Sequence, residues 1–320
     1  MKSLILDSFL KLTALKKRIM LSINIPVYNI DVYDLVEQLL EQTKKLNSDY
    51  EIRVYDDASR AVIRKKNRKL EGLPNVTYKE MRRNVGRAAI RNKMGFESKF
   101  EYLLFIDADS KLISESYLEH YLRYAETGNI MCGGTTYNPE RPADPEKTLR
   151  WYYGTHREAV SAQQKNRNKG FVITSNNFLI RKNIFKKIHF REDIKKYGHE
   201  DTMLGYDLFT NGYNIVHFDN PVEHTGLENA AVFLNKTKLA IGNLWLISQH
   251  LIDDKKALTE QVTFLNRYQK ITRFVPEALF RFLFKTFKIQ MENNLTGEKP
   301  KLFIYDFYKM CFYATIKIRA

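Results

Sequence analysis

The segment 102–110, Tyr-Leu-Leu-Phe-Ile-Asp-Ala-Asp-Ser, constrains the fold more than any other stretch of this chain. Five aromatic and branched apolar residues in succession are typical of a strand that is buried on both faces. The strand ends at Asp107 and Asp109. Residues two apart in an extended chain point to the same side, about 6.6 Å apart, so the two carboxylates can share one cleft.

Two neighbouring carboxylates repel each other unless a cation lies between them. Mg²⁺ and Mn²⁺ prefer oxygen ligands and commonly bind one or two carboxylates together with substrate phosphates. Asp-x-Asp is also common in polar turns after strands, so the motif alone leaves both interpretations open. The residues before and after the motif are needed to choose between a metal site and a polar turn.

Strands and helices alternate in the first third of the chain. Apolar patterns predict strands at 21–25, 51–55, 76–79 and 102–106, with helices at 34–46, 60–70 and 84–96 between them. Short links between such elements predict right-handed crossovers and a parallel sheet. Three of these strands run into polar, mostly acidic segments, so one edge of the sheet is expected to hold the chemistry.

The later elements are predicted from the same patterns. They are helices at 117–124, 148–159 and 201–211, strands at 130–137, 171–180 (interrupted at 174–177) and 213–218, and a turn at 223–226. Residues 162–170 are polar and basic and are predicted to form a mobile loop. From residue 228 onward the pattern is helical.

The composition, 44% hydrophobic and 28% charged over 320 residues, excludes a disordered chain. The formal net charge of +15 favours an anionic partner: a nucleoside diphosphate, an acidic membrane face or nucleic acid. Cys132 and Cys311 stand far apart in apolar surroundings, which favours reduced thiols in a cytoplasmic protein. No apolar run is long enough for a transmembrane helix, and residues 3–17 predict an amphipathic helix without a signal-peptide cleavage site.

Six motifs occur in order along the chain. They are Ile25-Pro-Val-Tyr-Asn29, Asp56-Asp-Ala-Ser59, Asn84-Val-Gly-Arg-Ala-Ala-Ile-Arg-Asn92, Asp107-Ala-Asp109, Thr174-Ser-Asn-Asn177 and His199-Glu-Asp201. Together they resemble the inverting family-two glycosyltransferases of the glycosyltransferase-A fold. The resemblance implies an α/β fold with a mostly parallel central sheet flanked by helices and a C-terminal helical extension.

The resemblance also implies a division of the chain. We expect an N-terminal amphipathic helix at 1–20, a glycosyltransferase domain at 21–228 and a helical region at 229–320. Within the domain, residues 21–110 would bind the nucleotide and residues 111–228 would supply the acceptor site and the catalytic base.

Seven positions are expected to contact the nucleotide by this resemblance: Pro26, Tyr28, Asp57, Asn84, Gly86, Arg87 and Asp107. Asp57 would accept a hydrogen bond from the imide N–H of uracil, although a solvated turn residue is the alternative. Arg87 would lie near the phosphates, and Asp107 would be the carboxylate nearer the ribose. A UDP-sugar is therefore the favoured donor.

The resemblance assigns Asp109 to the Mn²⁺ or Mg²⁺ site together with Asp107, and His224 either completes that site or is a surface histidine. Asp201 would be the general base that deprotonates the acceptor hydroxyl. Glu200 would bind the acceptor or only cap its helix. Acidic residues at helix starts are ordinary caps, so by local pattern alone Asp201 would be a cap; the upstream motifs favour the catalytic interpretation.

Three further residues are candidates for sugar binding. Asn176 and Asn177 are expected to line the sugar pocket, and Trp151 to stack on an acceptor sugar or simply to pack. The Gln-x-x-Arg-Trp motif of processive synthases is missing after the base, which favours transfer of a single sugar. The acceptor would be a glycan or a lipid-linked molecule.

Two other functions compete with this one. A haloacid dehalogenase-type phosphotransferase would use Asp107 as nucleophile, but it requires Thr or Val where this chain has Lys111. A non-catalytic module could bind nucleotides or nucleic acid through its charge; nucleic-acid binding would need no divalent metal and would weaken steeply with salt. Nucleic acid is not the expected partner.

The C-terminal region is rich in aromatic and basic residues, as in 279–289 and 301–318. Such helices can lie on an anionic lipid surface, or they can cap a domain with their aromatic face in the core. We therefore expect a cytoplasmic protein that can bind peripherally to the inner face of the membrane.

Overall fold

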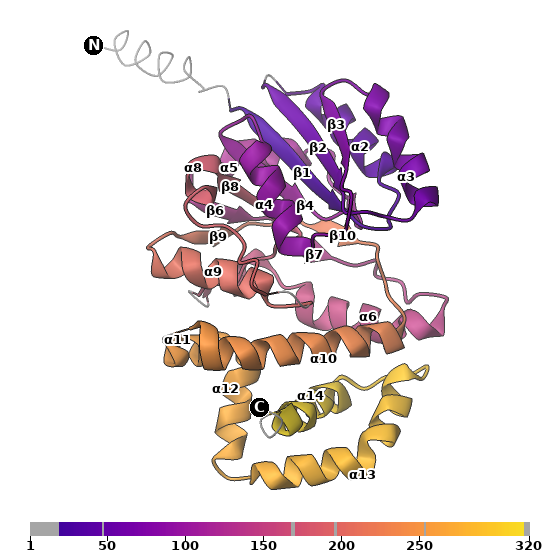
Figure 1. Ribbon diagram of the computed structural model, residues 1–320, viewed down its shortest axis with the longest axis vertical. Helices are drawn as coiled ribbons and strands as arrows, with labels where there is room; N and C mark the ends of the chain where they lie inside the picture. The colour runs from indigo at the N-terminus through magenta and orange to yellow at the C-terminus, as the bar shows by residue number, and fades with distance from the viewer. Residues whose placement is uncertain (1–18, 47, 168–169, 195–196, 253, 317–320) are drawn as a thin grey trace, which may run out of the picture.

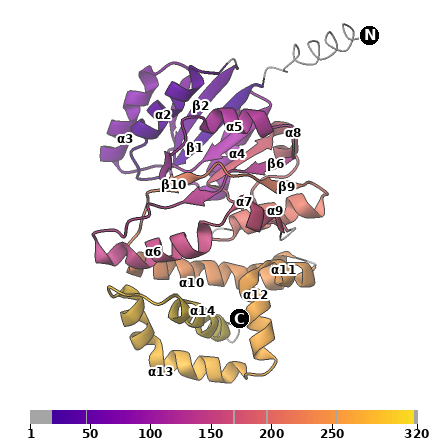
Figure 2. The same cartoon turned by 180° about the vertical axis from the view of Figure 1, so that it is seen from behind.

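The computed structural model describes residues 19–46, 48–167, 170–194, 197–252 and 254–316 (Figure 1). The helix predicted at 3–17 lies outside the described residues. The described chain consists of an α/β part above and a group of helices below it, separated by a long helix that runs across the molecule (Figures 1 and 2).

A seven-stranded sheet with the order β3-β2-β1-β4-β8-β6-β9 forms the centre of the α/β part. Its strands are β1 (Leu21–Val27), β2 (Tyr50–Asp56), β3 (Val76–Glu80), β4 (Tyr102–Ile106), β6 (Ile130–Cys132), β8 (Asn177–Arg181) and β9 (Ile215–His217). Only β8 runs opposite to the other strands of this sheet. The mostly parallel sheet expected from the sequence is therefore confirmed.

Strand β4 is buried on both faces, as its apolar run predicts. Leu104 and Ile106 pack into one core with helices α2 (Tyr33–Thr43) and α5 (Tyr117–Tyr124). Leu103 and Phe105 pack into a second core with α4 (Arg87–Glu97), α8 (Lys182–Phe185) and α9 (Glu200–Thr210). Helices α3 (Ala61–Asn67) and η1 (Arg68–Gly72) lie between β2 and β3 in the chain.

A three-stranded sheet, β5-β10-β7, lies beyond the carboxyl end of β4. It consists of β5 (Ser110–Leu112), β7 (Thr135–Thr136) and β10 (Val222–His224). The prediction of a turn over 223–226 is wrong in its first half, because Glu223 and His224 pair with Lys111 and Ser110. This pairing brings the histidine alongside the segment that carries Asp109.

Other boundaries also differ from the predictions. The strand expected at 130–137 is divided into β6 and β7, and the strand expected at 171–180 is limited to β8. The segment 145–158 forms η2 (Pro145–Lys147), α6 (Thr148–Tyr153) and η3 (Gly154–Glu158). The loop expected at 162–170 instead begins with a short helix, α7 (Ala162–Arg167), because Asp219 accepts a hydrogen bond from Ala162 N at 3.0 Å and Asn166 bonds the backbone of His217.

The C-terminal region is helical, as predicted. It comprises α10 (Ala230–Leu246), η4 (Ile247–Leu251), α11 (Lys255–Gln261), α12 (Thr263–Thr272), α13 (Glu277–Thr296) and α14 (Leu302–Ile316). Helix α10 lies between the α/β part and α14, and α13 forms the far end of the molecule (Figures 1 and 2). No helix within the described ranges is long and apolar enough to cross a membrane.

Candidate active site

Hydrogen bonds around Asp57 join the carboxyl ends of β1 and β2 to the segment between β3 and α4, beginning with Asp57 N, which donates to Val27 O at 2.8 Å. Its two carboxylate oxygens accept from Val85 N at 2.7 Å and Gly86 N at 3.0 Å, and Asn84 Nδ2 donates to Asp57 O at 3.2 Å. Burial raises the pKa of Asp57, while the two backbone N–H groups oppose that rise. Gly86 has φ 92°, a backbone conformation that favours glycine. Asp57 thus fixes the turn from which α4 starts.

Helix α4 carries two arginines from that turn to the end of β4. Arg91 is 3% exposed and donates from Nη2 to Asp107 Oδ1, while Arg87 Nη2 lies 3.7 Å from Asp107 Oδ2. Arg87 also forms a 2.7 Å ion pair from Nε to Glu200 Oε1. The one-turn spacing of the two arginines, visible in the sequence, therefore places both on Asp107.

Asp109 lies two residues beyond Asp107 and faces His224. His224 Nδ1 is 3.5 Å from Asp109 Oδ1, and the His224 side chain is 14% exposed, so this histidine is not a free surface residue. Thr225 donates from N and Oγ1 to Asp109 O, at 2.8 and 2.9 Å. A Cβ at Gly226 would collide with the Asp109 carboxylate, so only glycine leaves room for it there.

The Asp109–His224 pair fits a divalent cation. Burial alone would raise the pKa of Asp109, but the hydrogen bond and charge of His224 and the charge of Arg87 hold it below its usual value. Hard divalent ions lie about 2.0–2.6 Å from their oxygen ligands, so two atoms 3.5 Å apart can bind one ion. Among the described residues no three His, Cys, Asp or Glu side chains gather around one point, so phosphates and water would have to supply the other ligands.

Asp201 lies in the first turn of α9. The backbone bends sharply before it: Glu200 Oε2 accepts from Gly198 N at 3.1 Å, and His199 adopts φ 69°. Burial, and then the neighbouring charge of Glu200, raise the pKa of Asp201 to about 6. Burial would also raise the pKa of Glu200, but the Arg87 guanidinium lowers it. Glu200 is thus held as an ionised partner of Arg87, and Asp201 is the carboxyl of the pair that can exchange a proton near neutral pH.

The C-terminal region helps to hold this turn. Asn243 of α10 donates from Nδ2 to the carbonyls of Tyr197 and Gly198, at 3.2 and 3.0 Å. The Tyr197 ring lies between two cations, with Arg87 5.2 Å and Lys236 of α10 4.9 Å from its centroid. Helix α10 is therefore part of the site's framework, which no motif in the sequence indicated.

One cavity of 340 Å³ joins these groups. Among its lining residues are Arg87, Asp107, Asp109, Asn176, Asp201 and His224, all of which the sequence analysis selected. It is also lined by Tyr137, Arg150, Arg157, Glu158, Lys165, Tyr197, Glu228 and Lys236, which it did not select. The two acidic groups expected to hold the metal and to take the proton therefore share one space.

Arg150 forms ion pairs with two carboxylates that also line this cavity. It is 8% exposed, donates to Tyr137 Oη at 2.9 Å and lies 3.0 Å from Glu158 Oε2 and 3.7 Å from Glu228 Oε2. Its second terminal nitrogen, Nη1, is buried without a hydrogen-bond partner among the described residues. Arg150 thus offers a charged donor to whatever enters the cavity.

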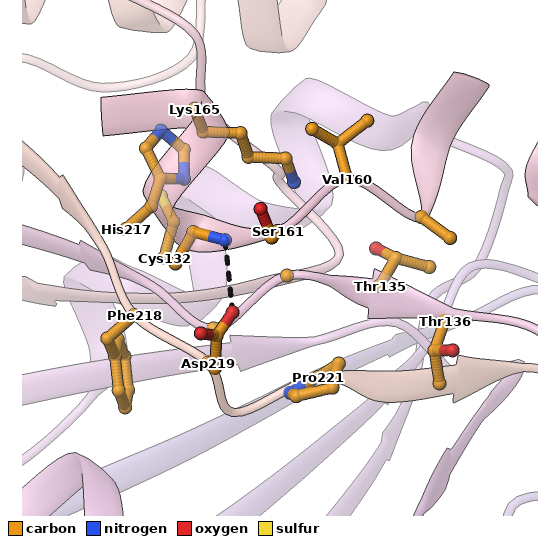
Figure 3. A pocket seen from close by; sticks show the side chains of 14 residues that line it. Cys132, Thr135, Thr136, Val160, Ser161, Lys165, His217, Phe218, Asp219 and Pro221 are labelled. Atoms are coloured by element: carbon orange, nitrogen blue, oxygen red, sulfur yellow. Dashed lines mark hydrogen bonds between the residues drawn. The ribbon is translucent and has the colours of Figure 1, made fainter. Parts of the chain in front are cut away.

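A second pocket of 270 Å³ opens beside the cavity, and Thr135 and Lys165 line both. Figure 3 shows the Lys165 side chain extending across this side pocket, above the bond between Ala162 N and Asp219. Lys165 Nζ is buried without a hydrogen-bond partner in the part of the chain described here, and burial lowers its pKa. The side pocket therefore adjoins the cavity along Thr135 and Lys165.

Five of the seven positions expected to contact the nucleotide lie outside the cavity lining but on the same edge of the sheet: Pro26, Tyr28, Asp57, Asn84 and Gly86. Tyr28 is 54% exposed at the end of β1, where a planar base can stack on it. Asn177 is placed differently from our expectation. Its side chain is fully buried, accepting from Tyr117 and Tyr121 Oη at 2.6 Å and donating to Gly134 O, so it holds the sheet together instead of lining the pocket.

Trp151 also does not line the cavity. Its Nε1 donates to Asn138 O at 2.8 Å, and its ring lies against Tyr152. Arg150, its neighbour on α6, is the residue that faces the cavity.

Comparisons with known proteins identify the family of the chain and its fold. The sequence model described as Glycosyl transferase family 2 matches residues 22–189, which is more than half of the chain. The chain belongs to this family. It has the expected α/β glycosyltransferase-A fold, and the phosphotransferase alternative is set aside.

Similar proteins include poly(ribitol-phosphate) beta-N-acetylglucosaminyltransferase TarP of Staphylococcus aureus, 32% identical over 113 residues. That stretch covers 34% of this chain and about a third, 33%, of TarP. Mannosyltransferase PcManGT of Pyrobaculum calidifontis, solved with GDP-Man and Mn²⁺, has a TM-score of 0.58 at 13% identity, over 95% of this chain and 87% of its own. S. aureus TarS has a TM-score of 0.51 at 18% identity, over 86% and 47%. The likeness to PcManGT and TarS shows a shared fold.

Proposed function

We propose that this glycosyltransferase transfers one sugar, with inversion at the anomeric carbon, from a nucleoside diphosphate sugar to a hydroxyl of a glycan or lipid-linked acceptor. The observation that supports this most is the single cavity that contains Asp109 and His224 as well as Asp201. A displacement reaction needs the leaving group and the attacking hydroxyl on opposite sides of one sugar. A cavity lined by both a cation site and a separate carboxyl base offers a place for each of the two groups.

Each side chain has a role in this proposal. Asp201 accepts the proton of the acceptor hydroxyl as its oxygen attacks the anomeric carbon. Arg87 holds Asp107 and Glu200 in place and adds positive charge near the departing diphosphate. Asp109 and His224 would hold the divalent ion, which when bound neutralises charge on the leaving diphosphate. Their mixed oxygen and nitrogen ligands favour Mn²⁺ over Mg²⁺.

The donor base would lie between Tyr28 and the Asp57 turn. Each carboxylate oxygen of Asp57 accepts one hydrogen bond from a backbone N–H group. Each oxygen has a further lone pair, which can accept a hydrogen bond from the imide N–H of the base. This supports a uracil nucleotide, and the TarP similarity makes UDP-GlcNAc the first donor to test. GDP-mannose is the second, because PcManGT was solved with it.

The acceptor would enter past Arg150 and the side pocket. Four cations (Arg150, Arg157, Lys165 and Lys236) and two carboxylates (Glu158 and Glu228) line this part of the cavity. The unpartnered nitrogens of Arg150 and Lys165 support an acceptor that carries anionic groups, as a phosphate-bearing glycan does. TarP, whose acceptor is poly(ribitol-phosphate), offers a precedent within the family.

Thermal unfolding tests the donor and the metal together. A ligand present at 100 times its Kd adds about 2.7 kcal/mol to the free energy of unfolding. We expect UDP-GlcNAc with Mn²⁺ to raise Tm, and neither UDP-GlcNAc alone nor Mn²⁺ alone to do so to the same extent. GDP-mannose, the second candidate donor, and dTDP-sugars are compared under the same conditions. If no nucleotide sugar raises Tm in the presence of Mn²⁺ or Mg²⁺, the proposed donor class is wrong.

The pH dependence of transfer should report Asp201. The base works only when ionised, and its pKa is raised to about 6, so kcat/KM should be level at neutral pH and fall tenfold per pH unit below about 6. Glu200→Gln removes a negative neighbour and should move the midpoint to lower pH. Initial rates at saturating Mn²⁺ would measure both profiles. A wild-type profile that stays level through pH 5 would contradict the assignment of this base.

A further inference from the structure

Helix α13 presents an apolar face that no other described segment covers, at the end of the molecule farthest from the central sheet (Figures 1 and 2). Leu279, Phe282 and Ile289 are 45%, 61% and 69% exposed. They are three and seven residues apart, which places them on one side of a helix. The opposite side of α13 is packed, because Phe280, Met291 and Leu295 are buried in the helical cores.

The corner between α12 and α13 adds a fourth apolar side chain. Phe274 is 88% exposed there. We call the set Phe274, Leu279, Phe282 and Ile289 the α13 face. A fully exposed phenylalanine and three exposed neighbours on one terminal helix are more than the single apolar side chains scattered over ordinary surfaces.

Basic residues accompany the α13 face. Between residues 267 and 301 the chain has eight Lys and Arg and three Glu. Arg273, Lys285 and Lys288 are exposed, and none of them pairs with an acidic side chain among the described residues. Glu277 is paired with Arg281 at 4.0 Å, and Glu292 with Lys238 at 3.2 Å. The surface around the apolar side chains is therefore positively charged.

We propose that the α13 face binds an anionic lipid surface. An interfacial helix inserts its apolar side chains below the headgroups while its lysines and arginines contact anionic lipids. A second copy of this chain is the less suitable occupant, because it would bring two positive faces together. Docking through α13 would keep the catalytic cavity clear of the lipid, since α10 and α14 lie between the cavity and α13 (Figures 1 and 2).

Vesicle sedimentation with the full chain tests this proposal without relying on catalysis. We expect binding to phosphatidylcholine vesicles that contain phosphatidylglycerol, and little binding to phosphatidylcholine alone. Replacing Arg273, Lys285 and Lys288 by Gln should weaken the partition coefficient about 100-fold, at about fivefold for each charge. Replacing Phe274, Phe282 and Ile289 by Ser should weaken it about tenfold for each side chain, and these positions are exposed enough for the fold to survive.

The matched control is Lys65→Gln/Lys69→Gln/Lys186→Gln, which removes the same charge from exposed positions in the α/β part. We expect it to bind vesicles like the wild type. Equal weakening by this control would mean that net charge, and not the α13 face, determines binding, which overturns the proposal. So would equal binding to neutral vesicles. A dimer in light scattering that Phe282→Ser dissociates, with no vesicle binding, would assign the face to a second copy instead.

Discussion

Asp201→Asn is expected to lower kcat by about 10³-fold, because a general base contributes about 10²- to 10⁴-fold to such reactions. Asparagine has nearly the same shape as aspartate, and its Oδ1 can still accept the 2.7 Å hydrogen bond from Thr202 N. The start of α9 should therefore keep its geometry. What is lost is the ability to take the acceptor's proton. Single-turnover transfer and calorimetric titration with donor and Mn²⁺ would separate the chemical step from binding.

Glu200→Gln is the informative comparison for this prediction. It removes the charge that pairs with Arg87 at 2.7 Å but leaves the proton acceptor in place. Its loss of kcat should be clearly smaller than that of Asp201→Asn, and its effect should include the shift in pH profile described above. If Glu200→Gln were the more damaging change while Asp201→Asn turned over normally, the roles of the two neighbours would have to be exchanged.

The parts of the site that the sequence predicted are those set by local patterns. The run Tyr102–Ile106 forms a strand with these bounds because both its faces are buried. Once this strand is predicted, Asp107 and Asp109 are placed at the edge of the sheet, and no long-range contact has to be known. Because α4 begins after Gly86, the four-residue spacing of Arg87 and Arg91 places both side chains on one face of that helix. The hydrophobic periodicity and the turn residues of the local sequence are enough to predict such features.

Long-range contacts explain what the sequence did not reveal. Strand β10 has three residues and exists because β5 and β7, both distant in sequence, pair with it. Arg150 and Trp151 are adjacent on α6, and Arg150 faces the cavity through contacts with Tyr137, Glu158 and Glu228. Asn177 follows Asn176 directly, yet the hydroxyls of Tyr117 and Tyr121 hold it in the core. No local pattern distinguishes the members of these pairs.

Asp109→Asn is expected to abolish Mn²⁺-dependent donor binding and to lower transfer by about 10³-fold, since a metal at a leaving diphosphate stabilises the transition state by several kcal/mol. The variant loses the charged member of a two-residue site, and a neutral amide oxygen is a much weaker ligand. His224→Gln should weaken Mn²⁺ binding by about tenfold or more while Asp109 still binds. Manganese titration by calorimetry in the presence of UDP would measure both losses.

Glu223→Gln is the matched control for these two variants. Glu223 adjoins His224 on β10, but it is not among the residues that line the cavity. Its replacement should leave Mn²⁺ affinity and transfer close to the wild-type values. That result would show that the losses in the Asp109 and His224 variants do not come from removing any nearby negative charge. A chelator should reproduce the Asp109→Asn phenotype in the wild type, and added Mn²⁺ should reverse it. Full activity in the chelated protein would show that Asp109 and His224 serve the donor without a metal.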